Sequence, residues 1–263
     1  MTDTDRVAIV TGAANGIGKA TAIRLAEDGF ALFLVDKDEG GLAATVGAIA
    51  DAGGIAEARS ADVLSRSEVE AAVAAAMTTY GRIDAVANIA GGAGPRNLHQ
   101  IDEIEDDDWD LVIDLNLRST FMCCRAVVPI MRDQRYGRIV NMSSTIAHGR
   151  FGPVGTAGNR LVYAAAKSGI LGFTKQLAKD VAAFGITVNA VAPWLILHEP
   201  GSRIRTRFEG LPPDVRQRTL ALSPMARPGE APEVAAAIAF LVSEPAGFVS
   251  GIEMPVDGAY LTG

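Results

Sequence analysis

The sequence is poor in the residues that build disulfide frameworks and metal centres. Among 263 residues there are two cysteines and three histidines. The cysteines, Cys123 and Cys124, are adjacent, so they cannot join distant segments, and we interpret them as small core residues of a helix. The acidic run 101–110 contains neither cysteine nor histidine and is interpreted as a helix start rather than a metal site. We therefore expect no bound metal and a reducing, cytoplasmic location.

Positive charge and long apolar stretches are scarce as well. The net charge is −7, which argues against nucleic acid or an anionic membrane surface as the main partner. No uninterrupted apolar run approaches the ~20 residues that span a bilayer, and the amino-terminal residues lack the basic region of a signal peptide. Because 49% of the residues are hydrophobic, the chain can bury a sizeable core.

Short apolar runs alternate with longer amphipathic segments along the whole chain. Strands are predicted at residues 7–10, 31–35, 55–58, 85–89, 138–142, 187–191 and 253–256. Helices are predicted at residues 17–28, 39–52, 67–80, 107–131, 162–184 and 231–243. Several strand runs are almost continuously apolar, as expected for strands covered on both faces. The alternation predicts an α/β, three-layer, doubly wound Rossmann fold with a seven-stranded parallel sheet, in one domain spanning residues 1–263.

The interval 194–217 breaks this alternation, because it is rich in proline and glycine and follows a strand end. In open parallel sheets ligands bind beyond the carboxyl ends of the strands, so we predict that this excursion covers the substrate. It carries Arg203, Arg205 and Arg207. These arginines could clamp an anionic group of the substrate, or they could be surface residues paired with neighbouring glutamates.

A glycine-rich stretch, TGAANGIG, follows the first predicted strand at residues 11–18. Gly12, Gly16 and Gly18 lie where the strand turns into a helix, so a pyrophosphate could approach the backbone without meeting a Cβ atom. The amino-terminal end of that helix favours anions. The stretch therefore predicts a dinucleotide site, with an ordinary tight turn as the alternative.

Asp36 ends the second predicted strand, 18 residues after Gly18. An acid near this distance typically binds the adenosine ribose hydroxyls, and its charge repels a 2′-phosphate. We therefore predict NAD rather than NADP as the cofactor, although Lys37 directly behind it could attract a phosphate. The alternative is that Asp36 caps the next helix.

Tyr163 and Lys167 are four residues apart in a predicted helix, so they share one face. The pKa of a phenol is near 10, and lowering it by about three units takes ~4 kcal/mol. A neighbouring ammonium and a positively charged nicotinamide would both act in that direction. Ser143 and Ser144 end the preceding strand, where a hydroxyl could reach the same cleft or merely form a turn.

Together these features resemble the classical short-chain dehydrogenase/reductase family over essentially the whole chain. The motifs that carry the resemblance are Thr11-Gly12-x-x-x-Gly16-x-Gly18, Asp62-Val63, Asn88-Ile89-Ala90-Gly91, Asn116, the Ser144, Tyr163 and Lys167 set, and Pro193. Divergent enoyl reductases of the family space the tyrosine and lysine more widely than the four residues found here.

The resemblance implies a role for each catalytic residue. Tyr163 would be the general acid and base, and Ser144 would bind the substrate oxygen. Lys167 would lower the pKa of Tyr163 and hold the nicotinamide ribose, while Asn116 would complete a proton relay through water. The implied cofactor-binding residues are Gly12, Asn15, Gly16, Ile17, Gly18, Asp36, Lys37, Asp62, Val63, Asn88, Ala90, Gly91, Tyr163, Lys167, Pro193 and Ile196.

The sequence departs from the family in two segments. Ser144 and Tyr163 are 19 residues apart, more than is usual, and Trp194 and His198 stand where the family usually has glycine and threonine. Both segments would border the substrate. The predicted substrate contacts are Ser144, His148, Phe151, Trp194 and Arg203.

The resemblance implies an NAD-dependent enzyme that transfers hydride between a secondary alcohol and the corresponding ketone, and a homotetramer or dimer. A 3-oxoacyl thioester reductase or a sugar or polyol dehydrogenase would fit the same motifs. From another class, a non-catalytic NAD-binding regulatory protein is the alternative, against which the complete set of catalytic residues argues.

Overall fold

The computed structural model describes residues 6–94, 101–149 and 158–262. Its main sheet has seven strands in the order β3-β2-β1-β4-β5-β6-β9, and every neighbouring pair is parallel. The strands are β1 (Val7–Thr11), β2 (Ala31–Asp36), β3 (Ile55–Ser60), β4 (Ala85–Asn88), β5 (Gly137–Met142), β6 (Ile186–Pro193) and β9 (Glu253–Val256). The predicted doubly wound parallel sheet is confirmed.

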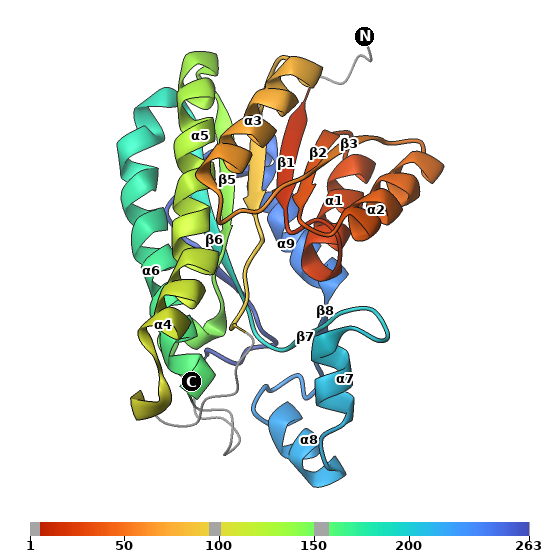
Figure 1. Ribbon diagram of the computed structural model, residues 1–263, viewed down its shortest axis with the longest axis vertical. Coiled ribbons are helices and arrows are strands. Elements are labelled where there is room, and N and C mark those ends of the chain that lie inside the picture. Colours follow the sequence, from red (N-terminus) through yellow and green to blue (C-terminus); the bar gives the residue numbers. More distant parts are fainter. Residues whose placement is uncertain (1–5, 95–100, 150–157, 263) are drawn as a thin grey trace.

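Helices cover both faces of the sheet (Figure 1). One apolar cluster joins the sheet to α1 (Gly16–Glu27), α2 (Glu39–Asp51) and α9 (Ala231–Val242). A second cluster joins the opposite face to α3 (Arg66–Tyr80), α5 (Ser119–Gln134) and α6 (Gly158–Val181). Successive β1 residues alternate between these clusters, since Val10 packs in the first and Ile9 in the second, as the two-residue period of a strand requires.

The helix predicted at residues 107–131 is interrupted, which corrects the sequence prediction. It consists of α4 (Asp106–Ile113), a π-helical segment (Asp114–Arg118) and then α5. Polar side chains bind backbone oxygens in this segment: Asn116 Nδ2 donates to Val112 O (2.8 Å), and Thr120 Oγ1 donates to Asn116 O (2.8 Å). A π segment is often found at functional sites.

The predicted excursion at residues 194–217 contains regular structure. It includes β7 (Ile196–Leu197), α7 (Arg203–Glu209) and α8 (Pro213–Leu220), and β7 pairs with β8 (Gly229–Glu230). Figure 1 shows α7 and α8 beyond the carboxyl ends of the strands. The excursion therefore extends beyond the predicted residue 217, as far as β8. This end could not be predicted, because the pairing of β7 with β8 involves only two residues of each strand and gives no sequence pattern.

The structure also contains short 3₁₀ turns, at η1 (Ile101–Glu103), η3 (Thr145–His148), η4 (Ala182–Phe184) and η5 (Glu244–Ala246).

Cys123 and Cys124 are buried in α5, as predicted, and burial raises the pKa of the Cys123 thiol to about 12. In the part of the chain that the structure describes, no helix combines the length and apolarity needed to cross a bilayer.

Candidate active site

The glycine loop after β1 is closed by contacts that leave no room for side chains. Gly12 (φ 70°) faces the end of β4, where an added Cβ would lie 2.9 Å from Ala90 N, and a Cβ on Gly18 would overlap Gly12 O. Thr11 Oγ1 accepts hydrogen bonds from Ile89 N (3.0 Å) and Ala90 N (3.2 Å). The motif predicts no contact for Thr11, whose hydroxyl joins the ends of β1 and β4 in the structure.

The amino-terminal end of α1 already holds an anion. Gly16 N donates to both carboxylate oxygens of Glu199, at 3.2 and 3.3 Å, and the His198 ring covers Gly16. An acidic group is the expected ligand at this end of a helix dipole. The Gly16 amide therefore binds an anionic group, as a pyrophosphate site requires. Glu199 would have to leave this amide before a pyrophosphate could bind there.

Asp36 lies against the glycine loop. Its carboxylate accepts hydrogen bonds from Ala14 N (3.1 Å) and Asp38 N (3.1 Å). The alternative role of Asp36 as a helix cap is wrong, because the side chain that caps α2 is that of Asp38, which accepts from Gly41 N at 3.1 Å. Lys37 is exposed. A carboxylate beside the loop, at the end of β2, is placed as an adenosine-ribose ligand requires.

The other implied cofactor residues lie along the same edge of the sheet. Asn88 is buried at the end of β4, and Asn15 is exposed at the start of α1. Asp62 and Val63 follow β3, where Asp62 Oδ1 accepts from Leu64 N (2.9 Å). Ile196 is 3% exposed and packs in the core beside α9, so its contact with a cofactor stays a prediction.

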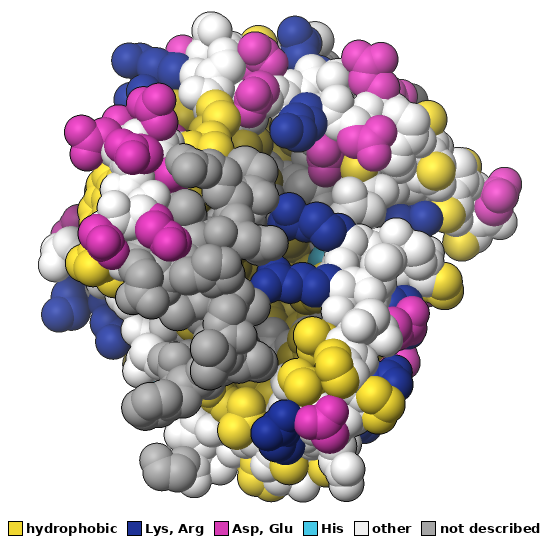
Figure 2. Space-filling model, turned by 60° about the horizontal axis from the view of Figure 1, so that its bottom comes forward, with side chains coloured by type: hydrophobic (Ala, Val, Ile, Leu, Met, Phe, Trp, Pro, Cys, Tyr) yellow, Lys and Arg dark blue, Asp and Glu magenta, His cyan; other side chains and the backbone are white. Residues whose placement is uncertain are grey.

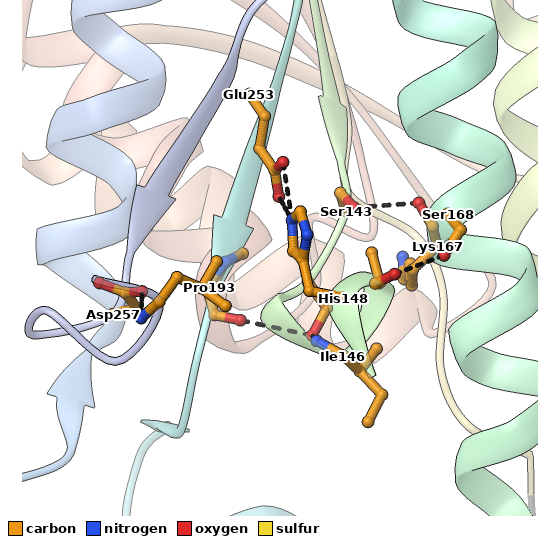
Figure 3. A network of polar contacts seen from close by, with 11 residues as sticks. Ser143, Ile146, His148, Lys167, Ser168, Pro193, Glu253 and Asp257 are labelled. Carbon is orange, nitrogen blue, oxygen red and sulfur yellow. Dashed lines mark hydrogen bonds and ion pairs between the residues drawn. The ribbon is translucent and has the colours of Figure 1, made fainter. Parts of the chain in front are cut away.

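The two serines after β5 point to different partners. Ser143 is 1% exposed, and its hydroxyl donates to the backbone oxygen of Lys167 at 3.0 Å. Ser144 is partly exposed, donates to Pro193 O at 3.3 Å and accepts from Ile146 N at 3.3 Å as the cap of η3. Figure 3 shows Ser143 beside Lys167 between β5 and α6. This division supports Ser144 as the serine available to a substrate.

Tyr163 and Lys167 lie one turn apart on α6. Lys167 is 1% exposed, and its Nζ donates to Met142 O, 2.6 Å away, and lies 5.3 Å from the centroid of the Tyr163 ring. Burial lowers the pKa of Lys167 to about 7 and raises the pKa of Tyr163 to about 12. The protein alone therefore does not lower the Tyr163 pKa, and the predicted lowering needs a further positive charge beside the phenol.

Asn116 lies in the π segment and faces the loop after β4. Its side chain exchanges two hydrogen bonds with the backbone of Gly92, accepting from N (3.1 Å) and donating to O (2.8 Å). A Cβ added to Gly91 would lie 2.6 Å from Asn116 Oδ1 and 3.4 Å from Lys167 Nζ. The amide and the ammonium therefore converge on Gly91, which must be glycine. The role of Asn116 in a water relay stays a prediction.

The predicted substrate residues are spread over several segments. His148 Nε2 lies 2.8 Å from Glu253 Oε1, and Figure 3 shows its ring turned toward that carboxylate of β9. Arg203 is exposed on α7, and Phe151 lies outside the described residues. Trp194 is buried after β6, where its indole stacks on Tyr260. Sequence reasoning did not find Tyr260, because no local pattern links positions this far apart.

Basic side chains lie at the end of the molecule where the carboxyl ends of the strands are found. Figure 2 shows Lys and Arg side chains on both sides of a hollow there. A cavity of about 470 Å³ lies between α1 and the excursion, lined in part by Lys19, His198, Glu199 and Arg205. Arg205 donates to His198 O (2.7 Å) and pairs with Glu209 (3.4 Å). These contacts favour the surface-pairing interpretation for Arg205.

Comparisons with known proteins agree with this geometry. The family described as Enoyl-(Acyl carrier protein) reductase matches residues 12–260. The chain is 40% identical to the short-chain reductase protein NovJ of Streptomyces niveus, over 97% of this chain and 93% of that protein. It is 37% identical to levodione reductase of Leifsonia aquatica, over 97% and 94%.

A solved structure, that of a single-residue variant of actinorhodin polyketide ketoreductase with NADPH, superposes with a TM-score of 0.88 at 34% identity and covers 99% of both chains. The chain thus has the parallel sheet, the glycine loop and the serine, tyrosine and lysine set, and it matches relatives along nearly its full length. The chain belongs to the classical short-chain dehydrogenase/reductase family, oxidoreductases that bind a nicotinamide dinucleotide.

Proposed function

We propose that this protein catalyses reversible hydride transfer between NAD and a secondary alcohol or its ketone. The observation that carries the proposal is the convergence of Lys167 Nζ and Asn116 Oδ1 on Gly91, with the Tyr163 ring 5.3 Å from the same ammonium. These contacts support the proposal because they bring a phenol, a buried amine and a side-chain amide together at one edge of the sheet. Levodione reductase and the polyketide ketoreductase, by their names, act on ketones.

Each catalytic residue has a task in this reaction. The bound dinucleotide supplies the hydride acceptor for alcohol oxidation and the hydride donor for ketone reduction. Ser144 would exchange its bond to Pro193 O for one to the substrate oxygen, which fixes the reacting carbon. Tyr163 would take the hydroxyl proton during oxidation and return it during reduction. Lys167, held by Met142 O, would place positive charge beside the phenol and stabilise the phenolate as long as it keeps its proton, which the folded protein holds up to about pH 7.

The preference for NAD rests on Asp36. Its carboxylate is fixed at the glycine loop by the amides of Ala14 and Asp38, and a 2′-phosphate at this place would meet its negative charge. The solved ketoreductase is named with NADPH, so the dinucleotide differs among relatives. Asp36→Ser should therefore raise the use of NADP relative to NAD.

We also assign a cytoplasmic location and a homotetramer or dimer to this protein. Large apolar side chains remain exposed on α4 and α5, on α9 at the opposite face of the sheet, and near the last strand, in keeping with subunit contacts. They include Trp109, Leu111, Phe121, Phe240 and Phe248. Light scattering coupled to gel filtration would measure the mass in solution, and a monomer at micromolar concentration would contradict the assignment.

The test of function is NADH formation from a panel of secondary alcohols, hydroxy acids, sugars, polyols and hydroxyacyl thioesters. NADP runs beside NAD, and Tyr163→Phe is the control. The best substrate separates an alcohol dehydrogenase from a 3-oxoacyl thioester reductase or a sugar dehydrogenase. Turnover with NAD that depends on Tyr163 is expected. Tight NAD binding without any turnover would instead favour the non-catalytic regulatory protein, and failure to bind either dinucleotide would refute the proposal.

A further inference from the structure

The aromatic stack of Trp194 and Tyr260 lies at the carboxyl ends of the last two strands of the sheet. The ring centroids are 5.3 Å apart, and the planes differ by 16°. Trp194 directly follows β6, and its backbone N donates to Val256 O of β9 at 3.3 Å. Both rings therefore belong to the edge at which open parallel sheets bind their ligands.

The backbone next to this stack contacts the serine that would bind the substrate oxygen. Ser144 Oγ donates to the backbone oxygen of Pro193 at 3.3 Å, and Trp194 is the next residue along the chain. Figure 3 shows Pro193 and Asp257, which precedes the Tyr260 turn, on neighbouring strand ends. A substrate whose oxygen lies at Ser144 would thus lie against the strand ends that carry the aromatic pair.

The turn that carries Tyr260 is fixed by several contacts. The Asp257 carboxylate accepts from the backbone N of Ala259 (3.0 Å) and of Leu261 (2.9 Å). Ser223, which follows α8, donates its hydroxyl to Gly258 O at 2.7 Å. Ala259 has a φ of 70°, a strained conformation for an alanine that the surrounding contacts must hold in place.

The two rings differ in accessibility. Trp194 is only 8% exposed, whereas Tyr260 remains partly exposed. Trp194 therefore covers one face of the Tyr260 ring and leaves part of the tyrosine accessible. A flat, oriented aromatic surface favours another planar ring in an offset or edge-on arrangement, an advantage that an open alkyl chain does not share.

We infer that Tyr260, backed by Trp194, is a specificity-determining wall of the substrate pocket and selects secondary alcohols and ketones that carry an aromatic ring beside the reacting carbon. This inference rests on the proposed function, since it places the reacting oxygen at Ser144. It deepens that function by assigning aryl carbinols and aryl ketones as the substrate class.

The test compares three secondary alcohols of equal carbon number: 1-phenylethanol, 1-cyclohexylethanol and 2-octanol. Tyr260→Ala should lower kcat/KM for 1-phenylethanol by about three- to tenfold and leave 2-octanol within about twofold. Tyr260→Phe, which keeps the ring, should retain the wild-type order of the three probes. Tyr260→Leu replaces Tyr260→Ala if the smaller side chain prevents folding, which thermal unfolding would reveal.

A second readout does not depend on turnover. In a Trp109→Phe background Trp194 is the only tryptophan, and acetophenone, added with NAD present, should quench its fluorescence unless Tyr260 is replaced by alanine. Equal losses for all three alcohols would make Tyr260 a structural residue only, and no loss for any would place the wall elsewhere; either result overturns the inference. If the wild-type protein oxidised none of the alcohols, the proposed function would fail. Quenching would still show whether an aryl ketone binds against Tyr260.

Discussion

Ser143 Oγ donates a hydrogen bond of 3.0 Å to the backbone oxygen of Lys167. This bond joins the end of β5 to the turn of α6 that carries the buried ammonium, and it leaves the neighbouring serine to face Pro193. Two adjacent hydroxyls thus have different tasks. One joins β5 to α6, and the other is the serine that we propose for the substrate oxygen.

Single substitutions should separate these two serines. Ser143→Ala removes a buried hydrogen bond and should lower the free energy of unfolding by about 1 kcal/mol, with kcat changed only a few fold. Ser144→Ala should lower kcat by about 10²- to 10³-fold with little change in stability, because it removes a donor to the reacting oxygen. Urea unfolding and steady-state kinetics check both. The opposite ranking would mean that Ser143 is the catalytic serine.

Gly91 should tolerate no side chain. In Gly91→Ala the new Cβ would lie 2.6 Å from Asn116 Oδ1, so the amide and the ammonium must move, and we expect kcat/KM to fall by about 10²-fold. Gly172→Ala in α6 is the matched control, since an added Cβ there meets nothing within 4 Å. It should raise stability by about 0.5–1 kcal/mol at unchanged activity. Wild-type kinetics in Gly91→Ala would contradict the convergence described for this site.

Burial of Lys167 should make stability depend on pH. Its pKa is about 7 in the folded protein against an ordinary value of 10.5. Below pH 7 both folded and unfolded chains hold the proton, so the full cost of burying the charge is present. Above pH 7 the folded protein releases the proton first, and the cost is relieved until about pH 10.5.

The free energy of unfolding of wild type, measured relative to Lys167→Met, should therefore rise between about pH 7 and pH 10. The variant is the reference because it shares the other titrating groups, including the buried thiols and phenols, which lower stability at high pH. Denaturant unfolding at a series of pH values gives both curves. Parallel curves would show that Lys167 keeps its ordinary pKa in the folded protein.

The sheet could be predicted from the sequence because its strands are short apolar runs separated by helices. Residues 7–10 and 31–35 are continuous enough in apolar character to predict buried parallel strands, and the structure extends them only slightly, to Thr11 and Asp36. The interruption near Asn116 could not be predicted, since it depends on side-chain hydrogen bonds to backbone oxygens within an otherwise regular helical pattern.

The candidate site divides in the same way. Gly12, Tyr163 and Lys167 could be predicted, because a glycine loop and a four-residue spacing are local patterns. The contact of Glu199 with Gly16 spans 183 residues, and the stack of Tyr260 on Trp194 also joins distant segments. Such pairs form only when the strand ends come together in the fold, so no local sequence pattern predicts them.

The most direct test of hydride transfer traces the hydrogen that leaves the carbinol carbon of the alcohol. The best alcohol from the substrate panel is labelled with deuterium at the carbinol carbon, and the reduced dinucleotide is analysed by mass spectrometry. We predict one deuterium in each NADH formed by wild type, and a rate reduced by about 10²- to 10⁴-fold in Tyr163→Phe. NADH without deuterium, or a Tyr163→Phe rate equal to that of wild type, would contradict hydride transfer with Tyr163 as the proton-transfer group.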